Sequence, residues 1–548
     1  MPVSPRRSVV LGTVAIALAL GACGGGDDGG EAAGEGDNVV TVRGCNPQSA
    51  FVPANSNEVC SGDILDQVFS FLIRYDAETG EPTNEIAADI TTPDNGLTWT
   101  ITLEDGWTFH DGSPVTAQSF VDAWNWAAYG DNATLNSYFF EPIQGYAEVQ
   151  NQVDADGNPI EGTAQAETMS GLEVVDDLTF NVTLTQAESQ FPMRLGYTAF
   201  APLPESFYED PEAFGQHPIG TGPFQFESWE PNIDVRLTAY PDYNGDVKPS
   251  IDGAIYRIYE NDDAAYNDLQ ADQLDIMPLL PTSALAGDTY RIDLGDRFIS
   301  RETGVFETIT FAPASVDERF ADPRIRQAIS MAINREEIVE QIFSGARTPA
   351  TGWVSPVVVN GYVEGACGEF CTYDPGAAQD LYAQTDGIDG PFPLSYNADS
   401  DHKAWVEAVC NQIDATLPVD CVPTPFVDLA TFRNEITNRE LTGMFRTGWQ
   451  MDYPSLENFL VPIFATGASA NDGDYSNAEF DQLVEEAART EGEAGAELYR
   501  QAEALLRNDM PAIPLWHRVN IAGYSSHVEN VQLTVFQTVD LLSVTTTG

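Results

Sequence analysis

Basic residues are scarce in this chain of 548 residues, which has 24 Lys and Arg against 85 Asp and Glu and a formal net charge of −61. A surface this negative repels the phosphates of nucleic acids and the anionic headgroups of membranes. We therefore expect no nucleic-acid partner. The hydrophobic fraction of 43% is ordinary for a globular protein, so a core can form, and the length predicts about three compact units.

Motifs of the common hydrolases are also missing. Neither G-x-S-x-G nor H-E-x-x-H occurs, which argues against a serine hydrolase and a zinc protease. Ser400 and Lys403 match S-x-x-K, but Lys248 is the only other lysine, so the accompanying K-T-G motif is impossible. We predict no catalytic residue, no cofactor and no metal. A secreted glycosidase needs only two opposed carboxylates and stays open as the enzyme alternative.

The first residues are typical of an export signal. A basic pair precedes the apolar stretch VVLGTVAIALAL (9–20), which is too short to be a permanent membrane span. LGAC (20–23) resembles the bacterial lipobox and predicts cleavage of a lipoprotein signal peptide, residues 1–22, and a lipid on Cys23. The Gly-, Asp- and Glu-rich residues 23–38 are then a flexible tether. An ordinary secretory peptide with an accidental cysteine is the alternative.

Six further cysteines remain in this exported chain, and an even number outside the cell indicates disulfides. The sequence leaves the connectivity open, but closure between near neighbours favours three pairs. These pairs are Cys45 with Cys60, Cys367 with Cys371, and Cys410 with Cys421. A zinc site at CGEFC (367–371) is disfavoured because no further Cys or His ligand is adjacent.

Strand and helix signals alternate along much of the chain. Apolar and polar residues alternate on both sides of Asp105-Gly106 in LTWTITLEDGWTFHDG (97–112), which predicts a β-hairpin followed by a helix from about Thr116. DPRIRQAISMAI (322–333) predicts a helix with an Asp N-cap and Pro in its first turn. The last strand candidate, VQLTVF (531–536), lies far from any obvious partner.

Five segments carry a family resemblance. In chain order they are LTWTITLEDGWTFHDGSPVTAQSF (97–120), PIGTGPFQFESW (218–229), DPRIRQAISMAINREEI (322–338), YDPGAAQDL (373–381) and GWQMDYPSLENFL (448–460). Together they resemble the solute-binding proteins of ABC importers, in particular the large three-domain family of oligopeptide- and dipeptide-binding proteins. The resemblance covers most of the mature chain.

This resemblance implies an α/β, two-lobed, periplasmic-binding-protein-like fold with an extra domain and a ligand cleft between the lobes. One lobe, called lobe I, is expected from three separate segments, with the extra domain inserted in it. The other lobe is called lobe III. The expected boundaries are lobe I at 39–76, 201–304 and 517–548, the extra domain at 77–200, and lobe III at 305–516.

The resemblance also implies a peptide site. In peptide-binding members an Asp in a G-W-x-x-D-Y context holds the α-ammonium of the peptide, and Asp452 occupies that position. Arg446 matches an Arg that approaches the peptide carboxylate in some members. A buried zwitterion needs a partner for each charge, which agrees with this pair. The alternative is that Arg446 and Asp452 pair with each other and that Trp449 belongs to the core.

The remaining expected contacts involve the peptide backbone. Strand addition against residues 448–451 and the loop around 57–63 would bind any peptide sequence. The expected ligand-binding residues are accordingly Asp452, Trp449, Gln450, Met451, Tyr453, Arg446, Asn57 and Ser61.

The sequence therefore predicts an extracytoplasmic, lipid-anchored and monomeric binding protein that captures peptides and delivers them to an ABC permease and its ATPase subunits. It is expected to touch the membrane only through its lipid and to catalyse no reaction. A receptor of the same fold for another solute, such as a sugar oligomer or a metal chelate, is the alternative.

Overall fold

The structure is a computed structural model that describes residues 38–547 except for 57, 155–158, 260, 359–360, 399 and 401. The predicted signal peptide, Cys23 and nearly all of the tether lie outside the described residues. Among the described residues, none of the helices combines the length and the apolar character that crossing a membrane requires.

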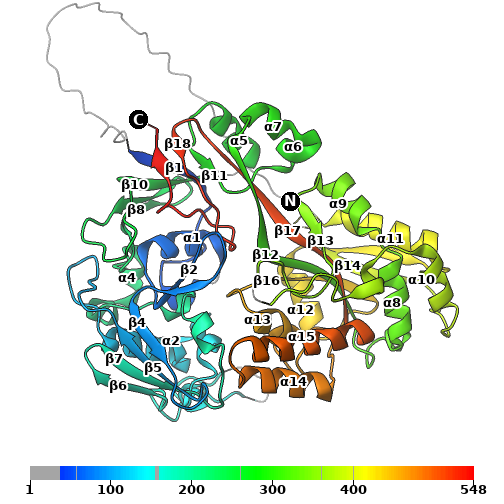
Figure 1. Ribbon diagram of the computed structural model, residues 1–548, viewed down its shortest axis with the longest axis horizontal. Coiled ribbons are helices and arrows are strands. Elements are labelled where there is room, and N and C mark those ends of the chain that lie inside the picture. The colour runs from blue at the N-terminus through cyan, green and yellow to red at the C-terminus, as the bar shows by residue number, and fades with distance from the viewer. Residues whose placement is uncertain are drawn as a thin grey trace, which may run out of the picture. The chain divides into compact units, whose positions relative to one another are not determined.

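Eleven strands form one large sheet that runs through the described chain (Figure 1). Its order is β15 (Cys421–Phe426), β14 (Phe392–Asn397), β16 (Met444–Gln450), β12 (Phe298–Phe311), β17 (Ala512–Tyr524), β11 (Ile276–Met277), β1 (Val39–Gly44), β10 (Gly253–Ile258), β9 (Asp234–Ala239) and β8 (Phe224–Glu230), with β13 (Arg347–Pro349) paired to β17. Parallel and antiparallel pairs are mixed, as in the pairing of β1 with β10 and of β12 with β16.

Two long antiparallel strands, β12 and β17, lie at the centre of this sheet. Their register shifts between Glu302 and Phe306. The expected boundaries between lobes, 304/305 and 516/517, fall inside these two strands near that shift, where Phe306 pairs with His517. Both crossings between the lobes are therefore made by paired, continuous backbone.

Two separate hydrophobic cores correspond to the two lobes. The first joins β1 and α1 of lobe I with the extra domain and the last residues of the chain, from Val40 to Val544. The second is built almost wholly from residues 306–516. A small third cluster covers the helices near residues 265–294. The extra domain shares a core with lobe I, so lobe I and the extra domain form one body.

The helices divide between the two expected lobes. Lobe I and the extra domain contain α1 (Val59–Val68), α2 (Ala117–Ala128), α3 (Tyr146–Val149), α4 (Pro211–Gln216), α5 (Asp262–Gln270), α6 (Thr282–Leu285) and α7 (Thr289–Leu294). Lobe III contains α8 (Pro323–Met331), α9 (Arg335–Phe343), α10 (Pro375–Tyr382), α11 (Lys403–Thr416), α12 (Leu429–Thr437), α13 (Leu456–Phe464), α14 (Ala478–Ala488) and α15 (Gly492–Asp509). The predicted N-cap is confirmed at α8, where the Asp322 side chain accepts a hydrogen bond from the backbone N–H of Arg324.

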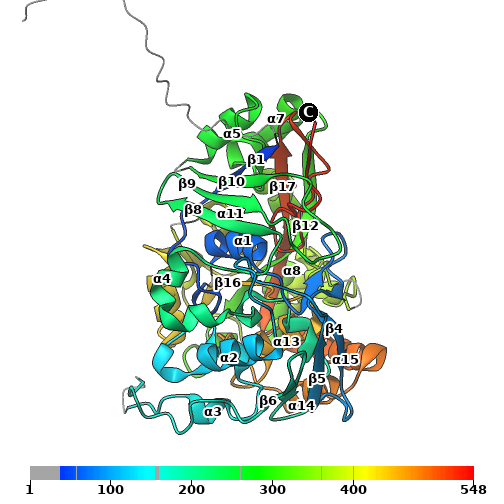
Figure 2. The ribbon, with the colours of Figure 1, turned by 90° about the vertical axis from the view of Figure 1, so that its left-hand side faces the viewer.

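The extra domain holds a four-stranded sheet beside α2 (Figure 2). Its order is β4 (Ala87–Thr91), β5 (Thr98–Leu103), β7 (Thr179–Thr183) and β6 (Leu172–Asp176). The predicted hairpin across Asp105-Gly106 is wrong. β5 pairs with β4 and β7 instead, and Trp107 and Phe109 are buried without forming a strand. Their alternation reflects burial in the core of the domain, which periodicity cannot distinguish from sheet pairing.

The predicted strand at 531–536 is also wrong. After β17, the chain forms only the short antiparallel pair β18 (Val528–Glu529) and β19 (Thr545–Thr546). The residues between β18 and β19 form a loop with one isolated bridge, from Leu533 to Val539. A second short pair joins β2 (Ile73–Tyr75) and β3 (Pro82–Asn84). Leu533 and Val535 alternate because they enter core regions, as Trp107 and Phe109 do.

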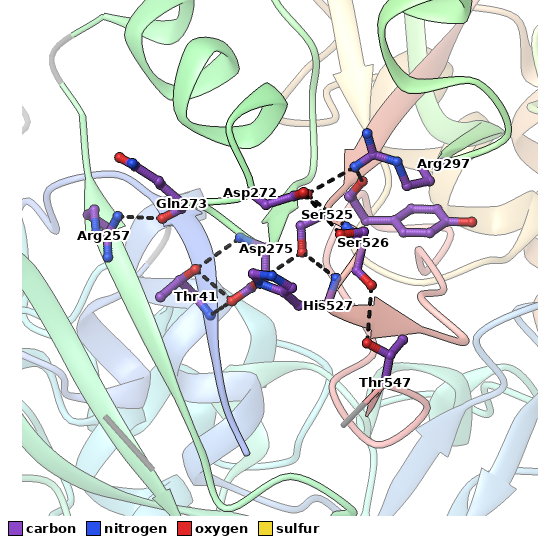
Figure 3. A network of polar contacts seen from close by, with 11 residues as sticks. Thr41, Arg257, Asp272, Gln273, Asp275, Arg297, Ser525, Ser526, His527 and Thr547 are labelled. Carbon is purple, nitrogen blue, oxygen red and sulfur yellow. Dashed lines mark hydrogen bonds and ion pairs between the residues drawn. The ribbon is translucent and has the colours of Figure 1, made fainter. Parts of the chain in front are cut away.

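A polar network fastens the separate segments of lobe I to one another (Figure 3). The buried Asp275 accepts hydrogen bonds from the backbone and hydroxyl of Thr41 and from the hydroxyl of Ser525, each at 2.8 Å. Asp272 accepts hydrogen bonds from the backbone and hydroxyl of Ser526 at 2.9 and 3.0 Å. Residues more than 230 positions apart in the sequence are thereby joined.

All three predicted disulfides are present. Cys45 is bonded to Cys60, Cys367 to Cys371, and Cys410 to Cys421. The last bond connects α11 to β15.

Candidate functional site

Two cavities lie along the C-terminal half of β16. The larger has a volume of about 460 Å³, and Gln450, Met451 and Asp452 form part of its wall. The smaller has a volume of about 280 Å³, and residues 446–449 form part of its wall. The predicted binding segment is thus divided between two cavities, with residues 446–449 in one wall and residues 450–452 in the other.

Both lobes contribute to the larger cavity. Lobe I supplies α1, β2 and the loop 534–542, the extra domain supplies Tyr138 and residues 196–198, and lobe III supplies the end of β16. Its charged lining residues are Glu58, Asp63, Asp66, Asp76, Glu85, Asp452, Asp540 and Arg74. The wall is therefore strongly acidic, and Arg74 itself is paired with Asp540 at 2.8 Å.

Asp452 is positioned by Asn458, a buried residue of α13. The Asn458 side-chain amide donates to Oδ2 of Asp452 at 3.0 Å, and its carbonyl oxygen accepts the backbone N–H of Asp452 at 3.0 Å. The same oxygen accepts the indole N–H of Trp449 at 3.0 Å. One amide thus holds the carboxylate in the larger cavity and the indole in the wall of the smaller one.

The carboxyl group of Asp452 is short of compensating charge. Burial raises its pKa to about 6, and the negative charge of Glu457 acts in the same direction. The hydrogen bond from Asn458 and the charge of Arg194 lower the pKa but do not cancel the effect of burial. A cation bound beside Asp452 would supply the missing charge.

Met451 joins the site to the crossing between the lobes. Its backbone N–H donates to the carbonyl of Gly304 at 2.9 Å, and the N–H of Gly304 donates to the carbonyl of Val535 at 3.0 Å. A Cβ atom at Gly304 would lie 2.2 Å from Cγ of Met451. A side chain at position 304 would therefore displace Met451 from the place it occupies beside the crossing.

Arg446 lies in the smaller cavity and has protein partners. Its Nε donates to Oδ1 of Asn397 at 2.8 Å, and its guanidinium is 3.7 Å from the carboxylate of Glu307. Burial raises the pKa of Glu307, while the charge of Arg446 lowers it. The alternative in which Arg446 pairs with Asp452 does not describe this structure, because the two side chains line different cavities.

Threonine hydroxyls, aromatic rings and one further ion pair form much of the remaining wall of the smaller cavity. The Thr447 hydroxyl lies 2.6 Å from those of Thr308 and Thr310, and Trp449 contributes to the wall. Arg433, a second cation in this wall, is bound to Asp472 at 2.6 Å. This cavity therefore carries two guanidinium groups and one carboxylate.

Tyr453 is buried and does not line either cavity. Its hydroxyl donates to Glu457 at 2.6 Å, and the guanidinium of Arg194 lies 5.5 Å from the centre of its ring. Arg194 belongs to the extra domain and forms an ion pair with Glu188. Tyr453 thus contacts the opposite lobe rather than the cavity.

Ser61 is also placed away from the cavity. It is fully buried, and its backbone N–H donates to Glu58 at 2.9 Å. Glu58 itself caps α1 and lines the larger cavity. Asn57, the other expected contact from this region, lies outside the described residues.

One edge of β16 is open beside these cavities. β14 pairs with β16 only at Met444 and Phe445. Within the described ranges, no strand is paired to Thr447–Gln450 on the side away from β12. An extended backbone can add to this edge.

The sequence interpretation missed several lining residues. Asp63 and Asp66 of α1 and the rings of Tyr75 and Tyr197 line the larger cavity. The apolar residues Ile64, Leu65 and Val68 mark the side of α1 that faces the core. The opposite side, which carries Asp63 and Asp66, could therefore have been identified from the sequence. The role of Asn458 had no local signal, because it depends on how α13 packs against the end of β16.

Comparison with known proteins identifies the relatives of the chain. Residues 81–471 match the family model described as the middle region of bacterial extracellular solute-binding proteins of family 5. The match covers more than half of the chain. It contains the extra domain from β3 onward, most of lobe III and part of the wall of the larger cavity, including Asp452, while α1 and residues 534–542 of that wall lie outside the match.

Curated relatives match along nearly the whole chain. The oligopeptide-binding protein OppA of Bacillus subtilis is 26% identical over 532 residues, which covers 93% of this chain and 94% of that protein. The glutathione-binding protein GsiB of Salmonella typhimurium is 25% identical, with 90% and 91% covered. The heme-binding protein A of Haemophilus influenzae is 25% identical, with 84% of each chain covered.

Solved structures share the fold. The murein tripeptide-binding protein MppA in its unliganded open form has a TM-score of 0.79 at 20% identity and covers 93% of this chain and 98% of its own. The Haemophilus influenzae OppA in complex with RPPGFSPFR has a TM-score of 0.71 at 20% identity, with 93% and 99% covered. The predicted α/β fold with two lobes and a cleft is confirmed.

Proposed function

The chain belongs to family 5 of the bacterial extracellular solute-binding proteins, and we propose that it captures peptides between its lobes and delivers them to the permease of an ABC importer. The observation that carries this proposal is the position of Asp452. Its carboxylate lines the larger cavity, is fixed by Asn458, and lacks a full counter-charge. The α-ammonium of a peptide is a cation of the right size for this place.

The rest of a peptide would follow β16. With its ammonium at Asp452, the peptide backbone adds to the open edge at Thr447–Gln450 and runs from the larger cavity toward the smaller one. The carboxylate end then approaches Arg446 and Arg433. Main-chain hydrogen bonds provide affinity that does not depend on sequence, so Trp449 and Met451 serve as walls for side chains.

Closure would take place at β12 and β17. The two strands carry the chain between the lobes, and their register shift near Gly304 places irregular backbone beside the site. A few residues that absorb a change in backbone angles are enough for a hinge. Because Met451 bonds to Gly304, a ligand held by residues 450–452 is coupled to the crossing.

The proposed cellular setting follows the sequence. A lipid on Cys23 and the tether 23–38 hold a monomeric binding protein at the outer face of the cell membrane, where a permease and its ATPase subunits receive the ligand. The protein acts by binding and release, with no catalytic step and no cofactor.

A metal chelate is a weaker candidate ligand, although one relative is named for heme binding. Heme carries carboxylate groups, and the larger cavity presents seven carboxylates against Arg74. An anionic chelate would be repelled there. A neutral sugar oligomer carries no cation, so it would leave the negative charge of Asp452 uncompensated.

Native mass spectrometry of the protein purified from its own cells tests this proposal. We expect the folded protein to carry copurified peptides, released on denaturation and identified by fragmentation. The purified protein should also bind synthetic alanine peptides, with a rise in melting temperature. A bound saccharide or metal complex without peptides, or turnover of a glycoside, would contradict the proposal.

A further inference from the structure

Helix α1 turns a charged face toward the larger cavity. Val59, Gly62, Asp63, Asp66 and Gln67 all line it. Their spacing is that of one face of a helix. The two aspartates are three positions apart, so their side chains are neighbours on this face. They form part of the wall of a cavity rather than a patch of outer surface.

These two aspartates have few partners in the chain. In the described structure Asp63 accepts no hydrogen bond and forms no ion pair, while Asp66 accepts one hydrogen bond, from the Thr198 hydroxyl at 3.3 Å. Arg43 is the cation that acts on Asp63, but its guanidinium is bound to Asp262 at 2.6 Å. Two carboxylates are therefore left facing the cavity without a bound cation.

Their ionisation is unfavourable as a result. Burial raises the pKa of Asp63 to about 8, and the charges of Asp66 and Glu58 raise it in the same direction. Asp66 is reached by water within the cleft, yet the surrounding walls reduce its hydration enough to raise its pKa to about 6. A cation between them would relieve both effects.

Aromatic rings accompany the carboxylates. Tyr75 and Tyr197 line the same cavity, and after burial the charges of Asp452 and Asp66 are among the causes that raise the pKa of both tyrosines. Phe536, also in the wall, lies 5.1 Å from the ring of Tyr75 between centres. Rings beside carboxylates are a favourable environment for organic cations.

General acidity of the chain does not explain this arrangement. The smaller cavity, formed by the same chain, carries Arg433 and Arg446 against Asp472. If composition alone set the lining, both cavities would be acidic. Asp452 is sufficient for one α-ammonium, so the charge of Asp63 and Asp66 is left for another group.

We propose that the ligand of the larger cavity carries a second organic cation, an ammonium or guanidinium group of a basic peptide side chain, which Asp63 and Asp66 bind. This rests on the proposed peptide function and adds the charge class of the ligand. Basic peptides are then preferred over neutral peptides of equal length.

Matched peptides test the preference by calorimetry. In a tetra-alanine peptide, each alanine in turn is replaced by Lys or by Nε-acetyllysine, which keeps most of the side chain and removes its charge. At one position or more, we expect the Lys peptide to bind the wild-type protein about tenfold more tightly than its acetylated partner. In the double variant Asp63→Asn, Asp66→Asn the ratio should fall below about threefold.

A second double variant controls for net charge. Glu205→Gln with Glu209→Gln also removes two carboxylates, both exposed and outside the cavity walls. It should retain the wild-type ratio. Equal affinities for Lys and acetyllysine peptides at every position, or a ratio unchanged by the Asp63 and Asp66 substitutions, would overturn the proposal and leave the peptide function intact.

Cadaverine carries an alkyl ammonium group like that of Lys but has no peptide backbone. It therefore tests whether the bound cation belongs to a peptide or to a free amine. We expect it to bind more weakly than the best Lys peptide. Tight cadaverine binding with no peptide binding would contradict the proposed function and also the peptide origin of the cation. Failure of cadaverine and all peptides to bind would overturn both proposals.

Discussion

The larger and smaller cavities differ in charge although one strand connects them. The larger is lined by seven carboxylates and Arg74, the smaller by Arg433, Arg446 and Asp472. The chain as a whole has 85 acidic and 24 basic residues, so the smaller cavity departs from the composition of the chain in sign. A gradient from anionic to cationic along β16 suits a zwitterion that lies along the strand, with its ammonium at one end and its carboxylate at the other.

The largest expected effect comes from neutralising the anionic end. Asp452→Asn should lower the affinity for a peptide with an unmodified N-terminus about 100-fold, because the ammonium then lies in the cavity without its charged partner. Calorimetry with a peptide and its N-acetylated form measures this change. The affinity for the acetylated form should change by less than about threefold, and equal losses for both peptides would show that Asp452 does not hold the ammonium.

Substitution of Arg446, at the cationic end, should lower the stability of the ligand-free protein. Arg446→Met removes the guanidinium that lies 3.7 Å from the buried Glu307, the cation with the largest effect on this carboxyl group, and should lower the free energy of unfolding by about 2 kcal/mol. Urea unfolding of the ligand-free protein measures this loss. Adding Glu307→Gln should restore more than half of it, and a purely additive double variant would contradict the coupling.

Asn458, which bonds to a residue in the wall of each cavity, comes next. Asn458→Ala removes the amide that bonds both Trp449 and Asp452, and it should lower the free energy of unfolding by about 1–2 kcal/mol. Peptide affinity should fall as well, since Asp452 loses its orientation. Trp449→Phe is the matched control, because it removes one of these bonds and keeps the carboxylate in place. An affinity loss as large in the control would assign the effect to the indole.

The acidic wall predicts a pH dependence of stability. The pKa of Asp63 is about 8 in the folded chain and about 3.9 when unfolded. Between these values the folded chain binds the extra proton, so this group makes the free energy of unfolding fall as the pH rises from about 4 to about 8. Asp63→Asn removes that loss.

Thermal unfolding of the ligand-free protein checks this pH dependence. The variant should be more stable than wild type by about 1–2 kcal/mol near pH 8, allowing for water in the cleft, and by much less near pH 4. The Glu205→Gln, Glu209→Gln protein should follow wild type at both values. A stabilisation that does not depend on pH would contradict a raised pKa at Asp63.

The smallest expected effect concerns the shape of the acidic wall. Gly62 lies inside α1, and a Cβ atom there meets nothing within 4 Å. Gly62→Ala should therefore raise the free energy of unfolding by about 0.5–1 kcal/mol through the lower entropy of the unfolded chain. Gly62→Trp would instead occupy the larger cavity and should compete with peptide. Peptide affinity unchanged in the Trp variant would place the ligand elsewhere.

Local signals predicted much of the fold. The N-cap at Asp322 and the three disulfides depend on residues close together in the chain, and all are present. Alternation alone was misleading at Trp107 and Phe109 and at 531–536, because a loop that enters a core also alternates. Periodicity reports burial, and pairing depends on the neighbouring strand.

The sequence by itself determined the family, the two-lobed fold and the presence of Asp452 in the segment that forms the cleft. Only the tertiary structure decided that Arg446 and Asp452 line different cavities, because that depends on how β16 ends against α13. It also brought α1 to the cavity that Asp452 lines, so that Asp63 and Asp66 form part of the same wall. Composition sets the total charge of a chain, while the packing of distant segments decides which charges share a cavity.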